Sequence, residues 1–147
     1  MIVEGLLATA RKRLITVNNH APLIAVATLL RDHDADLVVV SDAGGVLAGV
    51  ITKTDIVRQI SHCQGSGCMV AASAVMTQAV LYCRPDNLLH ESWLVMKERH
   101  LKNIPILDRA SRPIGVLNVR DTLEALLGEI EYEEVLLRAY VMCVGYH

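Results

Sequence analysis

Residues 49–55 read Gly49-Val50-Ile51-Thr52-Lys53-Thr54-Asp55, and residues 115–121 read Gly115-Val116-Leu117-Asn118-Val119-Arg120-Asp121. The two stretches align without a gap at an offset of 66 positions, which is the distance from Asp55 to Asp121. The same offset pairs Asp42 with Asp108, and the apolar run 38–40 with 104–106. Because apolar, turn and acidic positions recur in register, the sequence predicts two copies of one structural unit.

Each copy predicts the element order β-α-β-β-α. We expect a first strand at 14–17 and 80–83, and later a hairpin that turns at 42–45 and 108–113. Between them lies a helix whose apolar residues fit one buried face: Leu23, Val26, Ala27 and Leu30 in the first copy, and Leu89, Trp93, Leu94 and Met96 in the second. A unit of about 60 residues has little core of its own. The two repeats of this α/β (α+β) fold should therefore pack on each other about a pseudo-twofold axis.

We divide the chain into repeat 1 (1–62), a connector (63–72), repeat 2 (73–129) and a C-terminal helical tail (130–147). The connector holds Cys63 and Cys68, whose spacing would supply only half of a tetrahedral zinc site, so we expect no metal. The tail continues an apolar pattern at helical spacing: Leu123, Leu126, Leu127, Ile130, Leu137 and Val141. This stripe either folds back on its own module or covers a partner surface. We expect a homodimer, since a closed twofold contact is the commonest assembly.

The composition is that of a folded globular protein, with 52% hydrophobic and 20% charged residues. A net charge of −2 provides no field that would attract nucleic acid. No apolar run has the length of a membrane span, and the early basic cluster follows the first apolar residues rather than preceding them. We therefore expect a cytoplasmic protein with neither a nucleic-acid nor a membrane partner.

The aligned signatures, with the element order around them, resemble a pair of cystathionine-β-synthase (CBS) domains, also called a Bateman module. The resemblance covers residues 1 to about 129 and includes Gly49 to Arg58, Val75-Met76-Thr77, and Asn103-Ile104-Pro105-Ile106. It implies a regulatory module that binds an adenosine-containing ligand between its repeats, with AMP as the first expectation and ADP, ATP, NAD or S-adenosylmethionine as others. It also implies a signal to a partner, such as a regulated enzyme or transporter. The alternative is a CBS-fold scaffold that binds no nucleotide.

The resemblance implies two related sites. In each, an Asp accepts hydrogen bonds from the ribose hydroxyls, and a residue three positions earlier donates to phosphate: Asp55 with Thr52, and Asp121 with Asn118. The adenine would lie between apolar residues of the first strand and the segment that enters the second strand: Ile15, Ala35 and Leu37 beside Asp121, and Leu81, Leu101 and Asn103 beside Asp55. The flanking Thr16, Thr54, Tyr82 and Arg120 complete the expected set.

Elementary chemistry is compatible with these roles, because a carboxylate can chelate a diol and a helix N-terminus favours phosphate. The simpler alternative is that both Asp residues only cap helices. Arg120, which offers a planar fork of donors, leads us to expect a preference for phosphorylated ligands at the Asp121 site.

We predict no catalytic residues and no enzymatic activity. The six histidines are scattered, and none of the nucleophile, phosphate-loop or dinucleotide-binding motifs is present. Cys83 falls in an expected strand and is interpreted as a small buried hydrophobe.

Overall fold

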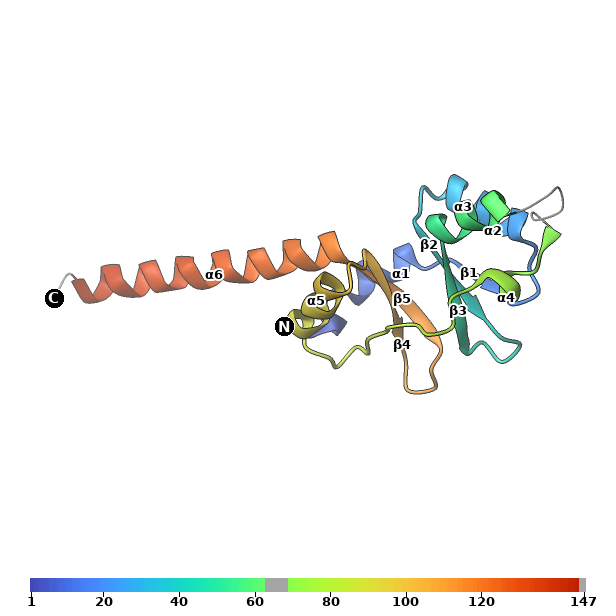
Figure 1. Cartoon of the computed structure of the whole chain (residues 1–147). Coiled ribbons are helices and arrows are strands. Elements are labelled where there is room, and N and C mark those ends of the chain that lie inside the picture. The colour runs from blue at the N-terminus through green and yellow to red at the C-terminus, as the bar shows by residue number, and fades with distance from the viewer. Residues whose placement is uncertain (63–68, 146–147) are drawn as a thin grey trace.

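The computed structural model of the protein describes residues 1–62 and 69–145. Two similar halves follow each other along the chain (Figure 1). The first half contains β1 (Thr16–Asn18), α2 (Leu23–Asp32), β2 (Leu37–Ser41), β3 (Leu47–Thr52) and α3 (Lys53–His62). The second contains α5 (Leu89–Glu98), β4 (Asn103–Leu107), β5 (Pro113–Asn118) and α6 (Val119–Gly145). Three short elements precede the halves: the 3-10 helix η1 (Val3–Leu6) and α1 (Leu7–Arg13) before the first, and α4 (Ala72–Val75) before the second.

The two hairpins keep the predicted 66-residue relationship in detail. Leu37 pairs with Thr52 as Asn103 pairs with Asn118, and the register shifts after Val40 in one hairpin and after the aligned Ile106 in the other. The tight turns also agree, since Gly45 and the aligned Ser111 both have positive φ values, of 79° and 60°. The mixed α/β fold with two related repeats is therefore confirmed.

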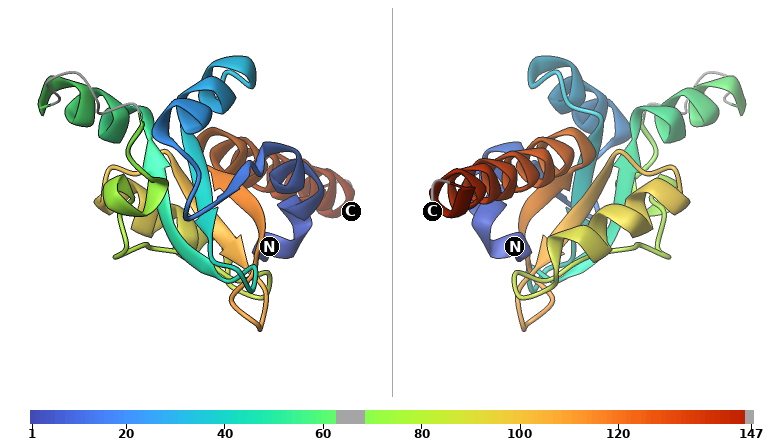
Figure 2. Two further views of the ribbon diagram at one scale, coloured as in Figure 1. Left: turned by 90° about the vertical axis from the view of Figure 1, so that its right-hand side faces the viewer. Right: turned by 90° about the vertical axis from the view of Figure 1, so that its left-hand side faces the viewer.

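The hairpins lie side by side in the middle of the molecule, and helices surround them (Figure 2). Leu37, Val39 and Val50 of the first repeat form one buried cluster with Val116 of the second. The opposite face of β2 carries Val38 and Val40 into the core beneath α2. Because strand side chains alternate between faces, β2 is covered on both sides and its run Leu37 to Val40 is fully apolar.

The expected strand at 80–83 is reduced to a single parallel bridge between Cys83 and Ile106, and the second sheet has only two strands. In the first repeat, the Val39 N–H donates to the Ile15 carbonyl at 2.8 Å and helps to seat β1. The residue aligned with Val39 is Pro105, which has no N–H to donate. The second repeat therefore lacks the bond that would extend this strand toward Leu81.

The buried face of α5 also differs from the prediction. Leu89 and Met96 are fully buried, but the third buried residue is Ser92, while Leu94 is 44% exposed and Trp93 only partly buried. Positions 89, 92 and 96 lie on one side of a helix, and Leu94 points away from it. The prediction used hydrophobicity alone and therefore assigned Leu94, rather than the small Ser92, to the buried face.

Each repeat is completed by the helix that precedes the other one. Val3 and Ala10, from η1 and α1, are buried in the core of the second repeat, whereas Ala72 of α4 is buried in the core of the first. A Cβ on Gly115 would lie 3.0 Å from the Ala10 Cβ, and one on Gly49 would lie 2.7 Å from the Thr77 carbonyl oxygen. The two aligned glycines thus allow the crossing segments to pass close to the strands.

The predicted tail is the continuation of α6, a single helix of 27 residues. It runs straight away from the two repeats (Figure 1), and side chains 131–142 are all exposed. The alternative in which the tail folds back on its own module is therefore wrong for the described residues.

Candidate functional site: two unequal clefts between the repeats

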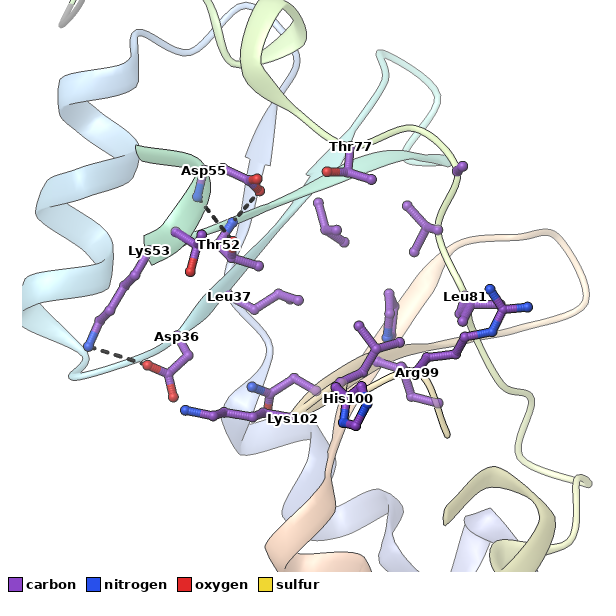
Figure 3. A pocket seen from close by; sticks show the side chains of 18 residues that line it. Asp36, Leu37, Thr52, Lys53, Asp55, Thr77, Leu81, Arg99, His100 and Lys102 are labelled. Atoms are coloured by element: carbon purple, nitrogen blue, oxygen red, sulfur yellow. Dashed lines mark hydrogen bonds and ion pairs between the residues drawn. The ribbon is translucent and has the colours of Figure 1, made fainter. Parts of the chain in front are cut away.

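The larger cleft, here called the Asp55 cleft, opens between the two repeats and has a volume of about 560 Å³. The first repeat contributes the end of β3 and the start of α3, with Thr52, Thr54 and Asp55. The second contributes Leu81 from the segment before α5, and the segment from Arg99 to Asn103 that enters β4 (Figure 3). The pseudo-twofold packing thus places residues about 50 positions apart in the sequence, such as Thr52 and Leu101, in the same cleft.

Asp55 and Thr52 form a reciprocal pair at the start of α3. The Thr52 N–H donates to Asp55 Oδ2 at 2.9 Å, and the Asp55 N–H donates to Thr52 Oγ1 at 3.2 Å. This is the geometry of a capping box, so Asp55 does serve as a helix-start residue. Asp55 Oδ1 has a weaker neighbour, Arg58 Nη1 at 3.7 Å, on a side chain that is 67% exposed. The carboxylate therefore retains acceptor capacity toward the cleft.

Apolar and cationic groups share the rest of the Asp55 cleft. Leu37, Leu81 and Leu101 supply aliphatic surface. Lys53 forms an ion pair with Asp36 at 3.4 Å, while Arg99 and Lys102 form none among the described residues. Figure 3 shows Lys53, Asp36 and Lys102 at one side of the cleft and Arg99 near Leu81 at the other. An aliphatic slot with positive charge at its rim can hold a flat ring that carries an anionic group.

A second cleft, the Arg13 cleft, has a volume of about 240 Å³ and occupies the pseudo-equivalent position. It shares Asp36, Leu37 and Asn103 with the Asp55 cleft and is also lined by Lys12 and Arg13 at the end of α1. Arg13 forms a bidentate pair with Asp121, with Nε 2.5 Å from Oδ2 and Nη2 2.9 Å from Oδ1. These hydrogen bonds raise the pKa of the Arg13 guanidinium above its ordinary value.

The side chain of Asn118 is engaged at both ends. Its Oδ1 accepts the N–H groups of Arg120 and Asp121 at the start of α6, at 2.9 and 3.2 Å. Its Nδ2 donates to Asn103 Oδ1 at 2.9 Å, which links β5 to β4, the two strands of the second repeat's hairpin. One of the two Nδ2 protons that could have bound phosphate therefore already has a protein acceptor.

Most of the predicted site residues line one of the clefts. The Asp55 cleft contains Leu37, Thr52, Thr54, Asp55, Leu81, Leu101 and Asn103, and the Arg13 cleft contains Ile15, Ala35, Leu37, Asn103 and Asn118. Four residues line neither cleft: Thr16, Tyr82, Arg120 and Asp121. Arg120 is exposed on the first turn of α6, and Tyr82 stacks with the Arg84 guanidinium at 5.4 Å instead.

Sequence reasoning missed Arg99 and Lys102 in the Asp55 cleft and the role of Arg13. The run Arg99-His100-Leu101-Lys102 is a signal that could have been found, because it surrounds the predicted Leu101. His100 has a φ of 55°, as the aligned Asp34 has a φ of 47°, so both segments turn sharply into their strands. For Arg13 no local signal exists, since its partner lies 108 positions away.

Other reactive groups lie apart from the clefts. Burial raises the pKa of the Cys83 thiol to about 12, so this cysteine is protonated at neutral pH and packs as an apolar residue. Cys63 and Cys68 lie outside the described residues. Within residues 1–62 and 69–142, no three His, Cys, Asp or Glu side chains gather as metal ligands. None of the described helices combines the length and the apolar character needed to cross a bilayer.

Solved structures with the same fold include several CBS domain proteins. An acetoin utilization protein from Vibrio cholerae superposes with a TM-score of 0.76 at 19% identity, over 91% of this chain and 96% of that one. CBSX2, solved in complex with AMP, gives 0.74 at 22% identity, over 86% and 96%. The CBS domain pair of MJ0100, in complex with 5′-methylthioadenosine and S-adenosyl-L-methionine, gives 0.72 at 20% identity, over 86% and 99%.

Relatives by sequence are longer than this chain. An uncharacterized protein of Methanopyrus kandleri is 26% identical over 127 residues, and the match spans 84% of this chain and 65% of that protein. A homoserine O-acetyltransferase of Methanohalophilus mahii is 25% identical over 114 residues, which are 78% of this chain but only 22% of the enzyme. The CBS domain family model matches residues 4–62 and again residues 72–128. The chain therefore belongs to the CBS domain family and carries two copies of the domain.

Proposed function

We propose that the protein is a regulatory module that binds an adenosine nucleotide in the Asp55 cleft and transmits the bound state to a partner enzyme or transporter. The observation that carries the proposal is the Thr52–Asp55 pair, which stands at the start of a helix on the wall of an inter-repeat cleft. A ribose diol can donate to the carboxylate, the Thr52 hydroxyl can donate to a phosphate, and the leucines can hold the adenine. The adenosine ligands of CBSX2 and MJ0100 support this class of ligand.

Thermal denaturation with AMP, ADP, ATP, NAD and S-adenosylmethionine tests this function. A ligand that binds only the folded chain raises its stability by mass action, by about 2.7 kcal/mol at a concentration of 100 Kd. Guanosine monophosphate is the matched control, because it carries the same ribose phosphate on another base. We expect a rise with at least one adenosine ligand. If none of the five changes the melting temperature, the non-binding scaffold replaces this proposal.

We expect AMP to bind more tightly than adenosine because Arg99 and Lys102, which form no ion pair among the described residues, place positive charge at the rim of the cleft. Removing either charge, as in Arg99→Ala or Lys102→Ala, should lower AMP affinity by about 0.5–1 kcal/mol, the usual value for an exposed ion pair. Adenosine affinity should stay nearly constant. Titration calorimetry with both ligands measures the ratio of AMP affinity to adenosine affinity in each variant. Lys97→Ala is the control, since Lys97 lies over Trp93 and does not line the cleft. An unchanged ratio in both cleft variants would remove these two side chains from the phosphate site.

We further propose that the chain forms a homodimer through its exposed helical surfaces. Leu94 and Val95 of α5 and Leu123, Leu127 and Ile130 of α6 are each 39% to 59% exposed. These two helices are in contact, so the exposed side chains belong to neighbouring surfaces. A second copy would remove this apolar area from water.

Light scattering should give about 32 kDa, twice the 16.1 kDa of one chain. A chain truncated after Gly128 should still fold, because side chains 131–142 make no buried contact, but it should lose part of the dimer contact. A monomer at micromolar concentration, with and without nucleotide, contradicts the dimer. General unfolding of the truncated chain contradicts the independence of the tail.

A further inference from the structure

We propose that Arg13 makes the two clefts unequal. The chain then binds one nucleoside, in the Asp55 cleft, because the Arg13 guanidinium occupies the carboxylate of Asp121 and closes the second position. This inference rests on the proposed function and deepens it by naming the occupied site and the residue that decides it.

The first step is the state of the two aligned carboxylates. Both oxygens of Asp121 accept a hydrogen bond from Arg13, at 2.5 and 2.9 Å, and the Asp121 side chain is 16% exposed. A vicinal diol that donates to Asp121 would have to share or displace these two charge-assisted hydrogen bonds. Asp55, by contrast, uses one oxygen for the Thr52 N–H, and its nearest cation is 3.7 Å away on a largely exposed side chain. A ribose can reach Asp55 without displacing a bidentate ion pair, whereas at Asp121 it must compete with one.

The second step is the origin of the difference in the sequence. The residue aligned with Arg13 at the 66-residue offset is Ala79, which lines the Asp55 cleft. A methyl group at this position leaves the larger volume, about 560 Å³, while the arginine lines the smaller one, about 240 Å³. The secondary structure differs as well, because α4 ends at Val75 whereas α1 continues to Arg13.

The third step is what holds Arg13 in place. It is the last residue of α1, and Ala10 of the same helix is buried against Gly115 of β5. α6 begins at the end of β5, so one rigid contact positions both partners of the ion pair. Asp121 is held in turn by its backbone N–H, which donates to Asn118 Oδ1. The pair is therefore pre-organised, which lowers the entropy cost of closing this position.

The Asn118 side chain is a second, independent difference between the clefts. Its Oδ1 accepts the Arg120 N–H, and one of its two Nδ2 protons is donated to Asn103 Oδ1. In the aligned Thr52, only the oxygen accepts a bond, and among the described residues its hydroxyl proton has no acceptor. The Thr52 hydroxyl thus remains available to a phosphate in the Asp55 cleft, whereas the aligned Asn118 already uses one of its two amide protons.

Titration calorimetry with adenosine and with AMP tests the inference, because adenosine has no phosphate that Arg13 could attract. The wild-type chain should bind one equivalent. Arg13→Ala should bind a second equivalent of adenosine, and Arg13→Lys, which keeps the charge but loses the fork, should bind it more weakly than Arg13→Ala. Arg11→Ala, an equal change of charge on the same helix, should stay at one equivalent.

The double variant Arg13→Ala with Asp55→Ala separates this inference from the proposed function. It should bind one equivalent, now at Asp121, whereas Asp55→Ala alone should lose most binding. Two equivalents on the wild type, or one equivalent on both Arg13 variants, overturn the role of Arg13 while nucleotide binding stands. If no variant and no wild-type sample binds either ligand, the proposed function fails, and this inference fails with it.

Discussion

Asp55→Ala is expected to weaken AMP binding by about 1.5–3 kcal/mol, the usual contribution of hydrogen bonds to a charged group. This loss corresponds to a roughly 10- to 150-fold higher Kd. The physical reason is that the carboxylate is mostly shielded from water, with its side chain 13% exposed, and would be the acceptor for the ribose diol. Titration calorimetry with the purified variant measures the change directly.

The same substitution should also cost folding stability. Asp55 Oδ2 accepts the Thr52 N–H, and loss of such a helix-start bond typically costs about 1 kcal/mol. Asp55→Asn keeps an oxygen for that N–H but removes the charge, so it should restore most of the stability while binding stays weak. Asp121→Ala is the aligned control, and it should leave the first equivalent of AMP unaffected. Normal affinity in Asp55→Ala, or a loss confined to Asp121→Ala, would place the nucleotide elsewhere.

Leu89→Ala should lower the free energy of unfolding by about 2–5 kcal/mol, because truncating a fully buried leucine loses its transfer free energy and leaves a cavity. Leu89 is 0% exposed and contacts the cluster of Cys83, Met96 and Ile106 in the second repeat. Small domains have about 5–15 kcal/mol of stability in total, so this one change removes a large share. Urea denaturation at low protein concentration is the measurement.

Leu94→Ala provides the matched control on the same helix. Leu94 is 44% exposed, and its truncation should change the free energy of unfolding by about 0.5 kcal/mol or less in the monomer. The sequence pattern places both leucines on the buried face, so the pair distinguishes the pattern from the structure. Equal losses in the two variants would mean that the described packing of α5 is incorrect.

The repeat, its hairpins and the helix starts could be read from the sequence because they depend on local signals. The turn after Asp42 is an example, since Asp42 Oδ1 accepts the N–H groups of Gly44 and Val46, and the aligned Asp108 does the same for Ala110 and Arg112. Short-range hydrogen bonds of this kind are specified by a few neighbouring residues. Thr52 and Asp55 of the Asp55 cleft belong to the same kind of local signal, whereas Leu81, Leu101 and Asn103 were expected from the family resemblance.

The missing strand at 80–83 shows where local signals stop. Leu81, Tyr82 and Cys83 have strand propensity, but a strand exists only if its neighbour can bond to it. The neighbour contains Pro105 at the position where the first repeat uses the Val39 N–H. Pairing is a property of two segments, so the propensity of one could not decide it.

By itself, the sequence determined that this protein is a pair of related β-α-β-β-α units with an acidic helix start in each, because periodicity and turn chemistry act over a few residues. Only the tertiary structure decided which residues meet across the molecule. It placed α1 on the second repeat and α4 on the first, directed α6 away from both, and joined Arg13 to Asp121 over 108 positions. The physical reason is that these contacts join residues far apart in the sequence, so they depend on packing at single positions, such as Ala10 against Gly115 and Ala79 in place of Arg13.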